Sequence, residues 1–243
     1  MTDIPTHAML LAAGLGTRMR PLSNEIPKPM LPLGGRPLVD HAIDRLAEAG
    51  VRELVVNTHY RAELLESHLT DRAVPPRIVF SREDALLETG GAVRAALPLL
   101  GEAPFFVVNG DAVWLDGPTP TLGRMAHAWG EDIDVLLLLH RSHQIIAETG
   151  LGDFALDPWG VPRRPEELEI VPYIYAGVQI LRPAFLAGFT PGRFSMNRVW
   201  DAALAAGRLR AIVHDGLWFH LSTPADLNEA EFALHAAVVG TTT

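Results

Sequence analysis

The sequence predicts an α/β protein built on a mixed, mostly parallel sheet flanked by helices. Short apolar runs alternate with amphipathic helical segments through the first half of the chain. Two of these runs end in glycine-containing loops, after Ala13 and after Val108. Hydrophobic residues make up 48% of the 243 residues and charged residues 20%, as in ordinary globular proteins. We therefore expect a single α/β domain over residues 1–243.

Each expected strand is a short apolar run bounded by turn residues, and each expected helix carries apolar residues at helical spacing. We expect strands at 8–13, 54–56, 77–80, 105–108, 135–139, 170–181 and 217–221. We expect helices at 37–49, 60–69, 91–100, 121–129, 197–206 and 223–239. Pro98 is expected to close the third helix early, and residues 151–165 to form a loop or short hairpin. In such sheets ligands bind beyond the carboxyl ends of the strands, where both glycine-containing loops are expected.

Composition narrows the classes of function. The formal net charge of -9 argues against a general nucleic-acid binder, which is usually basic. The longest apolar runs have the length of strands, so no membrane partner is expected. The chain has no cysteine and no signal-peptide pattern near its start, and we expect a cytoplasmic protein, either a monomer or a dimer.

Positive charge is concentrated between Gly14 and Pro37, in an otherwise acidic chain. Lys28 is the chain's single lysine among many arginines. A compact point charge required at that position is one explanation, and chance within an arginine-rich composition is the other.

The segment Leu11-Ala12-Ala13-Gly14-Leu15-Gly16-Thr17-Arg18-Met19-Arg20-Pro21 follows the first expected strand. A glycine loop at this place lets backbone N–H groups approach phosphate oxygens, and an arginine can hold a phosphate with two hydrogen bonds. Two close glycines alone are equally typical of a structural turn. Both the dinucleotide fingerprint and the Walker A pattern are absent from the sequence.

With Pro27-Lys28-Pro29-Met30-Leu31-Pro32, this segment resembles the N-terminal signature of nucleotide-sugar pyrophosphorylases, which are sugar-1-phosphate nucleotidyltransferases. The resemblance implies a Rossmann-like nucleotidyltransferase fold, with a nucleotide-binding half at about 1–112 and a sugar-side half at about 113–243. It also implies catalytic roles for Arg18, Lys28 and Asp111. The nucleotide-binding residues that it implies are Ala12, Ala13, Gly14, Gly16, Thr17, Arg18, Lys28, Glu83, Gly90 and Asn109.

Asn109-Gly110-Asp111 follows the expected strand at 105–108. A carboxylate there can hold Mg²⁺, which prefers oxygen ligands and keeps part of its coordination shell for substrate phosphates. The same three residues alone are more often a simple turn. We expect Asp111 to bind Mg²⁺, with Mn²⁺ as a possible replacement.

The run from Leu86 to Ala92 is similar to the uridylyltransferase branch that acts on N-acetylmuramate 1-phosphate. In relatives the matching loop contacts the nucleobase, and a helix N-cap by Thr89 is the structural alternative. The implied substrates are UTP and a sugar 1-phosphate. A guanylyltransferase acting on mannose or heptose 1-phosphate, or a catalytically weak nucleotide-binding regulatory homologue, is the alternative.

On the sugar side, the resemblance implies contacts from Asn57, Gly152, Asp153, Tyr175 and Gly177. The sequence departs from the family at His220, where relatives usually have a second metal-binding aspartate. Imidazole suits Mn²⁺ better than Mg²⁺. Three roles remain open for His220: metal ligand, ligand through a bound water, or packed histidine. The lysine that often holds the sugar phosphate in longer relatives is also missing; Arg163 or Arg164 can replace it or can be solvated.

Overall fold

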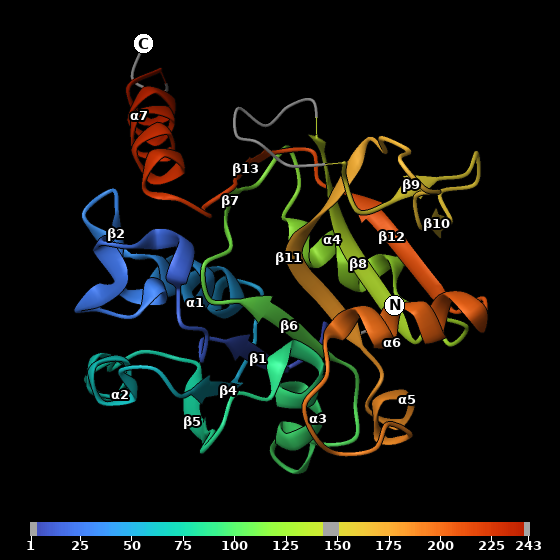
Figure 1. The fold of residues 1–243 in the computed structure, drawn as a ribbon, viewed down its shortest axis with the longest axis horizontal. Helices are drawn as coiled ribbons and strands as arrows, with labels where there is room; N and C mark the ends of the chain where they lie inside the picture. Colours follow the sequence, from blue (N-terminus) through green and yellow to red (C-terminus); the bar gives the residue numbers. More distant parts are fainter. Residues whose placement is uncertain (1–3, 143–150, 241–243) are drawn as a thin grey trace.

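The computed structural model describes residues 4–142 and 151–240. These residues are arranged around a central seven-stranded sheet (Figure 1). The strand order is β12-β8-β11-β6-β1-β4-β5. Strand β11 runs antiparallel to both of its neighbours, β6 and β8, whereas the other pairs in the sheet are parallel. The strands of this sheet are β1 (His7–Leu11), β4 (Glu53–Thr58), β5 (Arg77–Arg82), β6 (Phe105–Asn109), β8 (Val135–Arg141), β11 (Tyr173–Leu181) and β12 (Leu209–Val213). The predicted mixed, mostly parallel α/β fold is confirmed.

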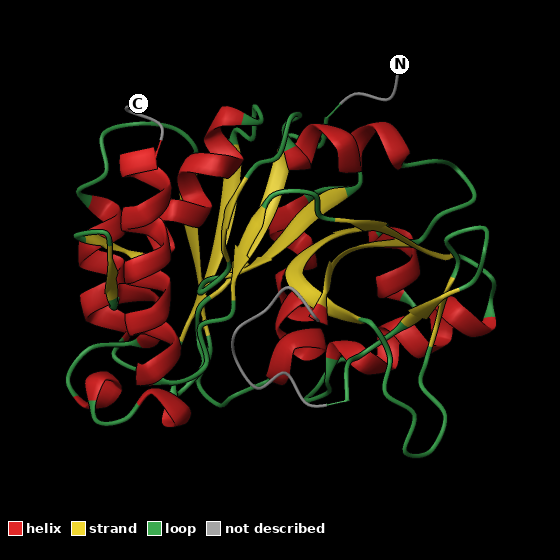
Figure 2. Cartoon of the chain, turned by 90° about the horizontal axis from the view of Figure 1, so that it is seen from above, coloured by secondary structure: helices red, strands yellow, loops and turns green. Residues whose placement is uncertain are grey.

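Helices cover both faces of the sheet, as Figure 2 shows from above. Helices α1, α2 and α4 pack on one face, and α3, α5 and α6 pack on the other. The helices are α1 (Leu38–Glu48), α2 (Ala62–Thr70), α3 (Glu88–Leu100), α4 (Thr121–Ala128), α5 (Pro183–Ala187), α6 (Met196–Ala205) and α7 (Pro224–Gly240). None of the helices in the described residues is long and apolar enough to cross a membrane.

Alternation of side chains along the central strands divides the core. Phe106 and Val108 of β6 face the core under α1, whereas Phe105 and Val107 face the core under α3. All four side chains are fully buried. Because successive strand residues point to opposite faces, a continuous apolar run marks a strand that is covered on both sides.

A smaller layer packs around the loop that follows β1. It contains the ribbons β2 (Pro32–Leu33) with β3 (Arg36–Pro37) and β7 (Val113–Leu115) with β13 (Leu217–Phe219). Met19, Val113, Phe219 and Leu227 share one apolar cluster there. This cluster joins the first loop, the β7–β13 ribbon and α7, and thereby brings the segment after β13 toward the first loop.

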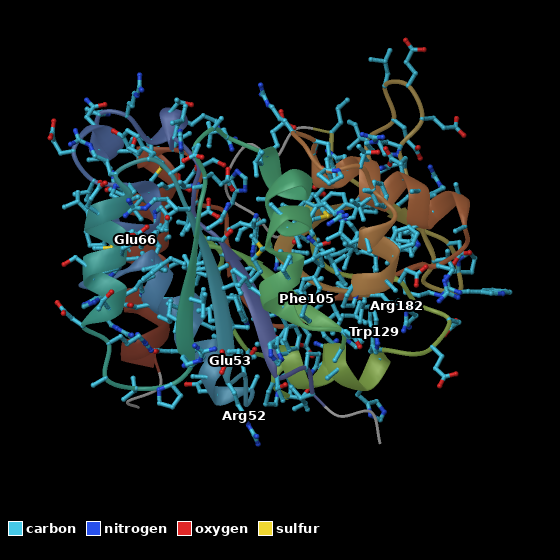
Figure 3. All side chains as sticks on the ribbon, turned by 90° about the horizontal axis from the view of Figure 1, so that it is seen from below. Arg52, Glu53, Glu66, Phe105, Trp129 and Arg182 are labelled. Atoms are coloured by element: carbon cyan, nitrogen blue, oxygen red, sulfur yellow. The ribbon has the colours of Figure 1, made fainter. Side chains whose placement is uncertain are left out.

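A buried carboxylate, Asp134, anchors part of the second half of the chain. Asp134 accepts hydrogen bonds from Arg182 Nε (3.0 Å) and from Arg208 Nε (2.6 Å). Arg182 also lies over the ring of Trp129, 5.4 Å from its centroid; Figure 3 labels the two side chains. The contacts tie the start of β8 to the end of β11 and the start of β12, because a buried charge must be paired.

Most expected elements match within a few residues, with two corrections and some omissions. Pro98 does not close its helix early: α3 continues to Leu100, because its apolar face is buried on the sheet and only its last turn loses a hydrogen bond. Strand β12, the short helix α5 and the ribbon strand β7 were not predicted. The expected hairpin within 151–165 is present as β9 (Ala155–Leu156) and β10 (Pro162–Arg163).

Thr89 does not cap α3, which is the second correction. The N-cap residue is Leu87, and the Thr89 hydroxyl instead accepts the backbone N–H of Met196 at 2.9 Å. Gly90 N–H and Gly91 N–H both donate to the Phe194 carbonyl at 3.0 Å. The start of α3 is therefore docked on the segment that leads into α6.

We predict opposite effects on stability for two glycine-to-alanine changes in helices. A Cβ at Gly91 would lie 2.2 Å from the Gly192 carbonyl oxygen, so Gly91→Ala should destabilise by about 1–3 kcal/mol. A Cβ at Gly123 in α4 meets nothing closer than 4.0 Å, so Gly123→Ala should stabilise by about 0.5–1 kcal/mol. Urea unfolding followed by circular dichroism measures both; equal effects would contradict the tight docking at Gly91.

Candidate active site

Two adjoining cavities open at the carboxyl ends of the central strands. The first has a volume of about 200 Å³ and the second about 350 Å³. Asn109, the last residue of β6, and Asp111, which lies just beyond it, line both of them. The expected ligand edge of the sheet thus carries a divided site, with Asp111 at the division.

The first cavity gathers most of the residues predicted to bind nucleotide. Its other contributors include Leu11, Pro29, Leu86, Glu88 and Thr89. The predicted nucleotide-binding residues that line it are Ala12, Ala13, Gly14, Gly16, Lys28, Glu83 and Asn109. All of its lining residues come from the first 111 positions of the chain.

The glycine loop leaves β1 and is held against the segment that carries Lys28. Gly16 has φ +61°, a backbone conformation that favours glycine, and a Cβ there would lie 3.0 Å from Lys28 Cβ. The Ser23 hydroxyl donates to the Gly16 carbonyl at 2.7 Å. Thr17 and Arg18 then begin a short 3₁₀ turn that is anchored by buried Met19. This packing explains why the loop needs glycine at position 16.

Lys28 and Asp111 form an ion pair between the first loop and the end of β6. The Lys28 side chain is 13% exposed and that of Asp111 is 30% exposed. Gly110 N–H donates to the Leu11 carbonyl at 2.8 Å, so the turn that carries Asp111 is pinned to the end of β1. The two opposite charges neutralise each other, and each is open to a ligand carrying phosphate or a cation.

The second cavity collects residues mainly from the second half of the chain, together with Arg18 from the first loop. Asp153, Tyr175, Gly177 and His220 line it. Gly177 lies where the register between β11 and β8 shifts, with φ +80°, and a Cβ there would lie 3.1 Å from Ala112 Cβ. Tyr175 N–H donates to Asp153 Oδ2 at 2.8 Å. Arg18 is exposed, and it is the residue from the first loop that reaches this cavity.

Burial shifts two titratable groups in the second cavity. Burial lowers the pKa of His220, and the nearby positive charges of Arg18 and Lys28 lower it further, although Asp226 and Asp111 act in the opposite direction. The His220 imidazole is therefore neutral at neutral pH. Burial also raises the pKa of Tyr175, with a smaller contribution from the Asp111 charge.

Several predicted site residues lie elsewhere. Asn57, predicted to contact sugar, lines the first cavity instead. Gly152 lies outside the second cavity's lining; it has φ +85°, and a Cβ there would lie 2.3 Å from the Val171 carbonyl oxygen, which gives it a structural reason to be glycine. Gly90 is buried and its N–H is already donated to Phe194, so this geometry does not support base reading by Gly90. Thr17 is outside the lining of both cavities.

Neither candidate for the missing lysine is free. Arg163 donates to both carboxylate oxygens of Glu169, which lowers the pKa of Glu169 to about 2. Arg164 pairs with Asp201 at 2.9 Å and lies over the Phe154 ring, 4.6 Å from its centroid. Both arginines are thus held in ion pairs within the second half of the chain.

Some lining residues were missed by sequence reasoning. Glu88 lines the first cavity with φ +59°, and its carboxylate accepts from Arg193 Nε at 2.9 Å. A left-handed conformation at a glutamate leaves no signal in the sequence. Trp218 lines the second cavity and donates from Nε1 to the Ala176 carbonyl at 2.9 Å. In the sequence, a tryptophan within an apolar run is interpreted as a core residue, because the distant carbonyl that its indole N–H contacts cannot be identified.

The donors for a divalent cation are few but suitable. Asp111 and His220 both line the second cavity. Within residues 4–142 and 151–240, no group of three or more histidine, aspartate or glutamate side chains is arranged to hold a metal. One carboxylate fits an ion such as Mg²⁺ that takes its remaining ligands from substrate phosphates and water, and an imidazole in the same cavity would favour Mn²⁺ as the alternative.

The chain is similar to known proteins over nearly its whole length. Residues 7–145 match the family model described as nucleotidyl transferase. The chain is 41% identical over 242 residues to the N-acetylmuramate alpha-1-phosphate uridylyltransferase of Caulobacter vibrioides, a match that covers 98% of this chain and 100% of that protein. It is 37% identical to the enzyme of the same name from Neisseria meningitidis, over 92% of this chain and 96% of that protein.

More distant similarities extend the comparison. The mannose-1-phosphate guanyltransferase of Aspergillus fumigatus is 29% identical over 90% of this chain, which spans 61% of that protein. Among solved structures, the inositol-1-phosphate CTP transferase from T. maritima has a TM-score of 0.77 at 23% identity, covering 97% of each chain. At that identity the structural likeness shows the fold alone.

Proposed function

The chain belongs to the nucleotidyl transferase family, and we propose that it joins UTP to N-acetylmuramate 1-phosphate, giving UDP-N-acetylmuramate and pyrophosphate. It is a sugar-1-phosphate nucleotidyltransferase, and similarity over nearly its whole length to two uridylyltransferases supports this choice of substrates. The guanyltransferase relatives are less similar and support the alternative pair of GTP and a mannose-like sugar phosphate.

The single observation that carries the proposal is the sharing of Asp111 by the two cavities. A transferase of this kind must bring the α-phosphate of a nucleotide against the phosphate of a sugar. The first cavity is lined only by residues up to Asp111, and the second is lined by residues from Asn109 onward together with Arg18. This supports a nucleotide-binding half at about 1–112 and a sugar-side half at about 113–243, with the reaction at the division.

The chemistry requires positioning more than proton transfer. A phosphate monoester has a second pKa near about 6, so the sugar phosphate is largely a dianion at neutral pH. One of its oxygens attacks the α-phosphorus of UTP in line; the new P–O bond forms as the bond to pyrophosphate breaks, and pyrophosphate carries away the electron pair. No general base is required. The chain must therefore align two anions and offset their repulsion.

Three features of the site supply that neutralisation. Arg18 and Lys28 provide positive charge from the first loop, and the glycine loop lines the first cavity, where its backbone N–H groups can approach phosphate oxygens. Arg18 lines the second cavity, and this supports a role for it on the side where the two phosphates would meet. With Arg163 and Arg164 already paired, we assign the contact with the sugar phosphate to Arg18.

We assign the divalent cation to Asp111, with His220 as its neighbour in the second cavity. When bound, such an ion polarises phosphoryl oxygens and offsets their negative charge. Asp111 would bind the ion. Lys28, its partner in the ion pair, lines the same cavity as the glycine loop and would contact phosphate.

The setting follows from the substrates. A muramate sugar comes from cell-wall material, so we place the reaction in peptidoglycan recycling in the cytoplasm. Both cavities are lined by one chain, so a monomer and a dimer would each carry the complete site.

The substrate assignment is tested by measuring pyrophosphate release over a matrix of triphosphates and sugar 1-phosphates. We expect UTP with N-acetylmuramate 1-phosphate to give the highest kcat/KM. A maximum for GTP with mannose or heptose 1-phosphate would replace the proposal by its alternative. No turnover with any pair, together with tight nucleotide binding, would indicate a regulatory homologue.

Asp111→Ala should reduce kcat/KM by at least about a hundredfold, because a charge-stabilising group at the reacting phosphates is lost. Far-ultraviolet circular dichroism should be unchanged, since Asp111 lies on the surface of a cavity and outside the core. Asp84→Ala, at an exposed position outside both cavities, is the matched control and should retain turnover. Near-normal turnover in Asp111→Ala would remove this residue from the mechanism.

His220→Asp should shift metal preference from Mn²⁺ toward Mg²⁺, because a hard carboxylate replaces a borderline imidazole ligand. The measurement is the ratio of turnover with Mn²⁺ to turnover with Mg²⁺, taken for the wild type and the variant. We expect this ratio to fall by about tenfold in the variant. An unchanged ratio would show that His220 is packed in the wall without contacting the ion.

A further inference from the structure

Asn57 and Glu83 form a buried polar pair in the wall of the first cavity. They are 4% and 7% exposed. Asn57 is near the end of β4, beside Leu11 of β1, and Glu83 directly follows β5. The mechanism described above uses neither side chain.

Three hydrogen bonds link the glycine loop, through Asn57 and Glu83, to the segment that precedes α3. The Ala12 N–H donates to Asn57 Oδ1 at 2.7 Å, and Asn57 Nδ2 donates to Glu83 Oε1 at 2.7 Å. The Leu87 N–H donates to Glu83 Oε2 at 2.9 Å. Ala12 is where the glycine loop leaves β1, and Leu87 precedes the Glu88 and Thr89 wall of the same cavity.

The backbone N–H groups of Ala12 and Leu87, at the two ends of this chain of hydrogen bonds, determine which functional groups positions 57 and 83 must carry. Backbone N–H groups only donate, so each end needs an acceptor. The contact between the two side chains needs one donor and one acceptor. One amide and one carboxylate meet all three requirements. Two amides would place N–H against N–H, and two carboxylates would place oxygen against oxygen.

Both side-chain oxygens of Glu83 are used in these bonds. Among the described residues Glu83 has no ion-pair partner, and its two oxygens accept from the neutral N–H groups of Asn57 and Leu87. Its main chain is also fixed, because its N–H donates to the Thr58 carbonyl at 2.8 Å. A buried carboxylate next to a cavity for a polyanion is costly unless its oxygens are satisfied.

We propose that Asn57 and Glu83 are positioning residues that set the separation between the phosphate-binding loop and the loop at the opposite wall of the nucleotide cavity. This inference rests on the proposed function, because the separation between the two loops must match the length of the bound nucleotide, from its triphosphate to its nucleoside. Holding both loops before the nucleotide arrives reduces the ordering cost of binding. Asn57 therefore acts on the nucleotide through Ala12 and is not a sugar ligand.

The test exchanges the two functional groups. In Asn57→Asp, two carboxylates meet; in Glu83→Gln, two amides meet. In the double variant N57D/E83Q, the carboxylate introduced at position 57 accepts from Ala12 and from the amide introduced at position 83. The oxygen of that amide accepts from Leu87, so all three bonds and the single charge are restored. We expect each single change to raise KM for UTP by about tenfold or more, since each leaves a buried polar clash. The double variant should return to within about threefold of the wild type.

The readouts separate positioning from general loss of structure. KM for the sugar phosphate should change by less than about twofold in every variant, because the second cavity is not touched. Hydrogen exchange should speed up at residues 12–16 and 84–90 in the single variants and recover in the double variant. Asp84→Asn, an exposed neighbouring carboxylate, is the control for loss of one charge and should leave KM for UTP unchanged.

Three results would overturn the inference. They are a double variant as impaired or unfolded as the worse single variant, single variants with unchanged KM for UTP, and a selective rise in KM for the sugar phosphate. All comparisons use the triphosphate that the wild type turns over best. A wrong substrate assignment would therefore show in the wild type alone, whereas a wrong positioning role would show only in the variants.

Discussion

The site depends on how one pair of opposite charges is placed. Lys28 comes from the first loop and Asp111 from the end of β6, and the two meet where the cavities adjoin. The strands β1 and β6 are neighbours in the sheet, and the Gly110 N–H donates a hydrogen bond to the Leu11 carbonyl at the end of β1. The backbone pairing of two central strands thereby fixes the distance between the loop proposed to bind phosphate and the carboxylate proposed to bind a cation. Everything else in the site is arranged around this fixed distance.

Sequence patterns predicted the parts of the fold in which local signals are strong. The strands β1, β4 and β6 are covered on both faces, and each reads as a continuous apolar run that stops at a polar or glycine residue. Strand β12 was missed because it is a short edge strand, Leu209–Val213, interrupted by Arg210. Helix α3 passes through Pro98 because burial of its apolar face outweighs one lost hydrogen bond.

The candidate site was predictable where function requires an unusual local sequence and unpredictable where it depends on distant packing. The glycine loop, Lys28 and Asp111 stand out locally, and the structure brings them to one edge. Gly90 was read as a base contact because it opens a helix, yet its N–H is used to dock the segment around Phe194. Asn57 was placed on the sugar side, although its side chain is bonded between Ala12 and Glu83. Such partners are separated by tens of residues, and no spacing in the sequence reveals them.

The residues that line the two cavities come from different parts of the chain, and this separation has a consequence for evolution. Every residue of the first cavity precedes position 112, and most of the second cavity comes after it. On the proposed assignment of the two cavities, mutations that reshape the acceptor pocket can accumulate in the later part of the gene while the part that binds the triphosphate stays constant. New sugar specificities are then reachable by small steps, each starting from an active enzyme, and recombination near this boundary would exchange acceptors without rebuilding the chemistry.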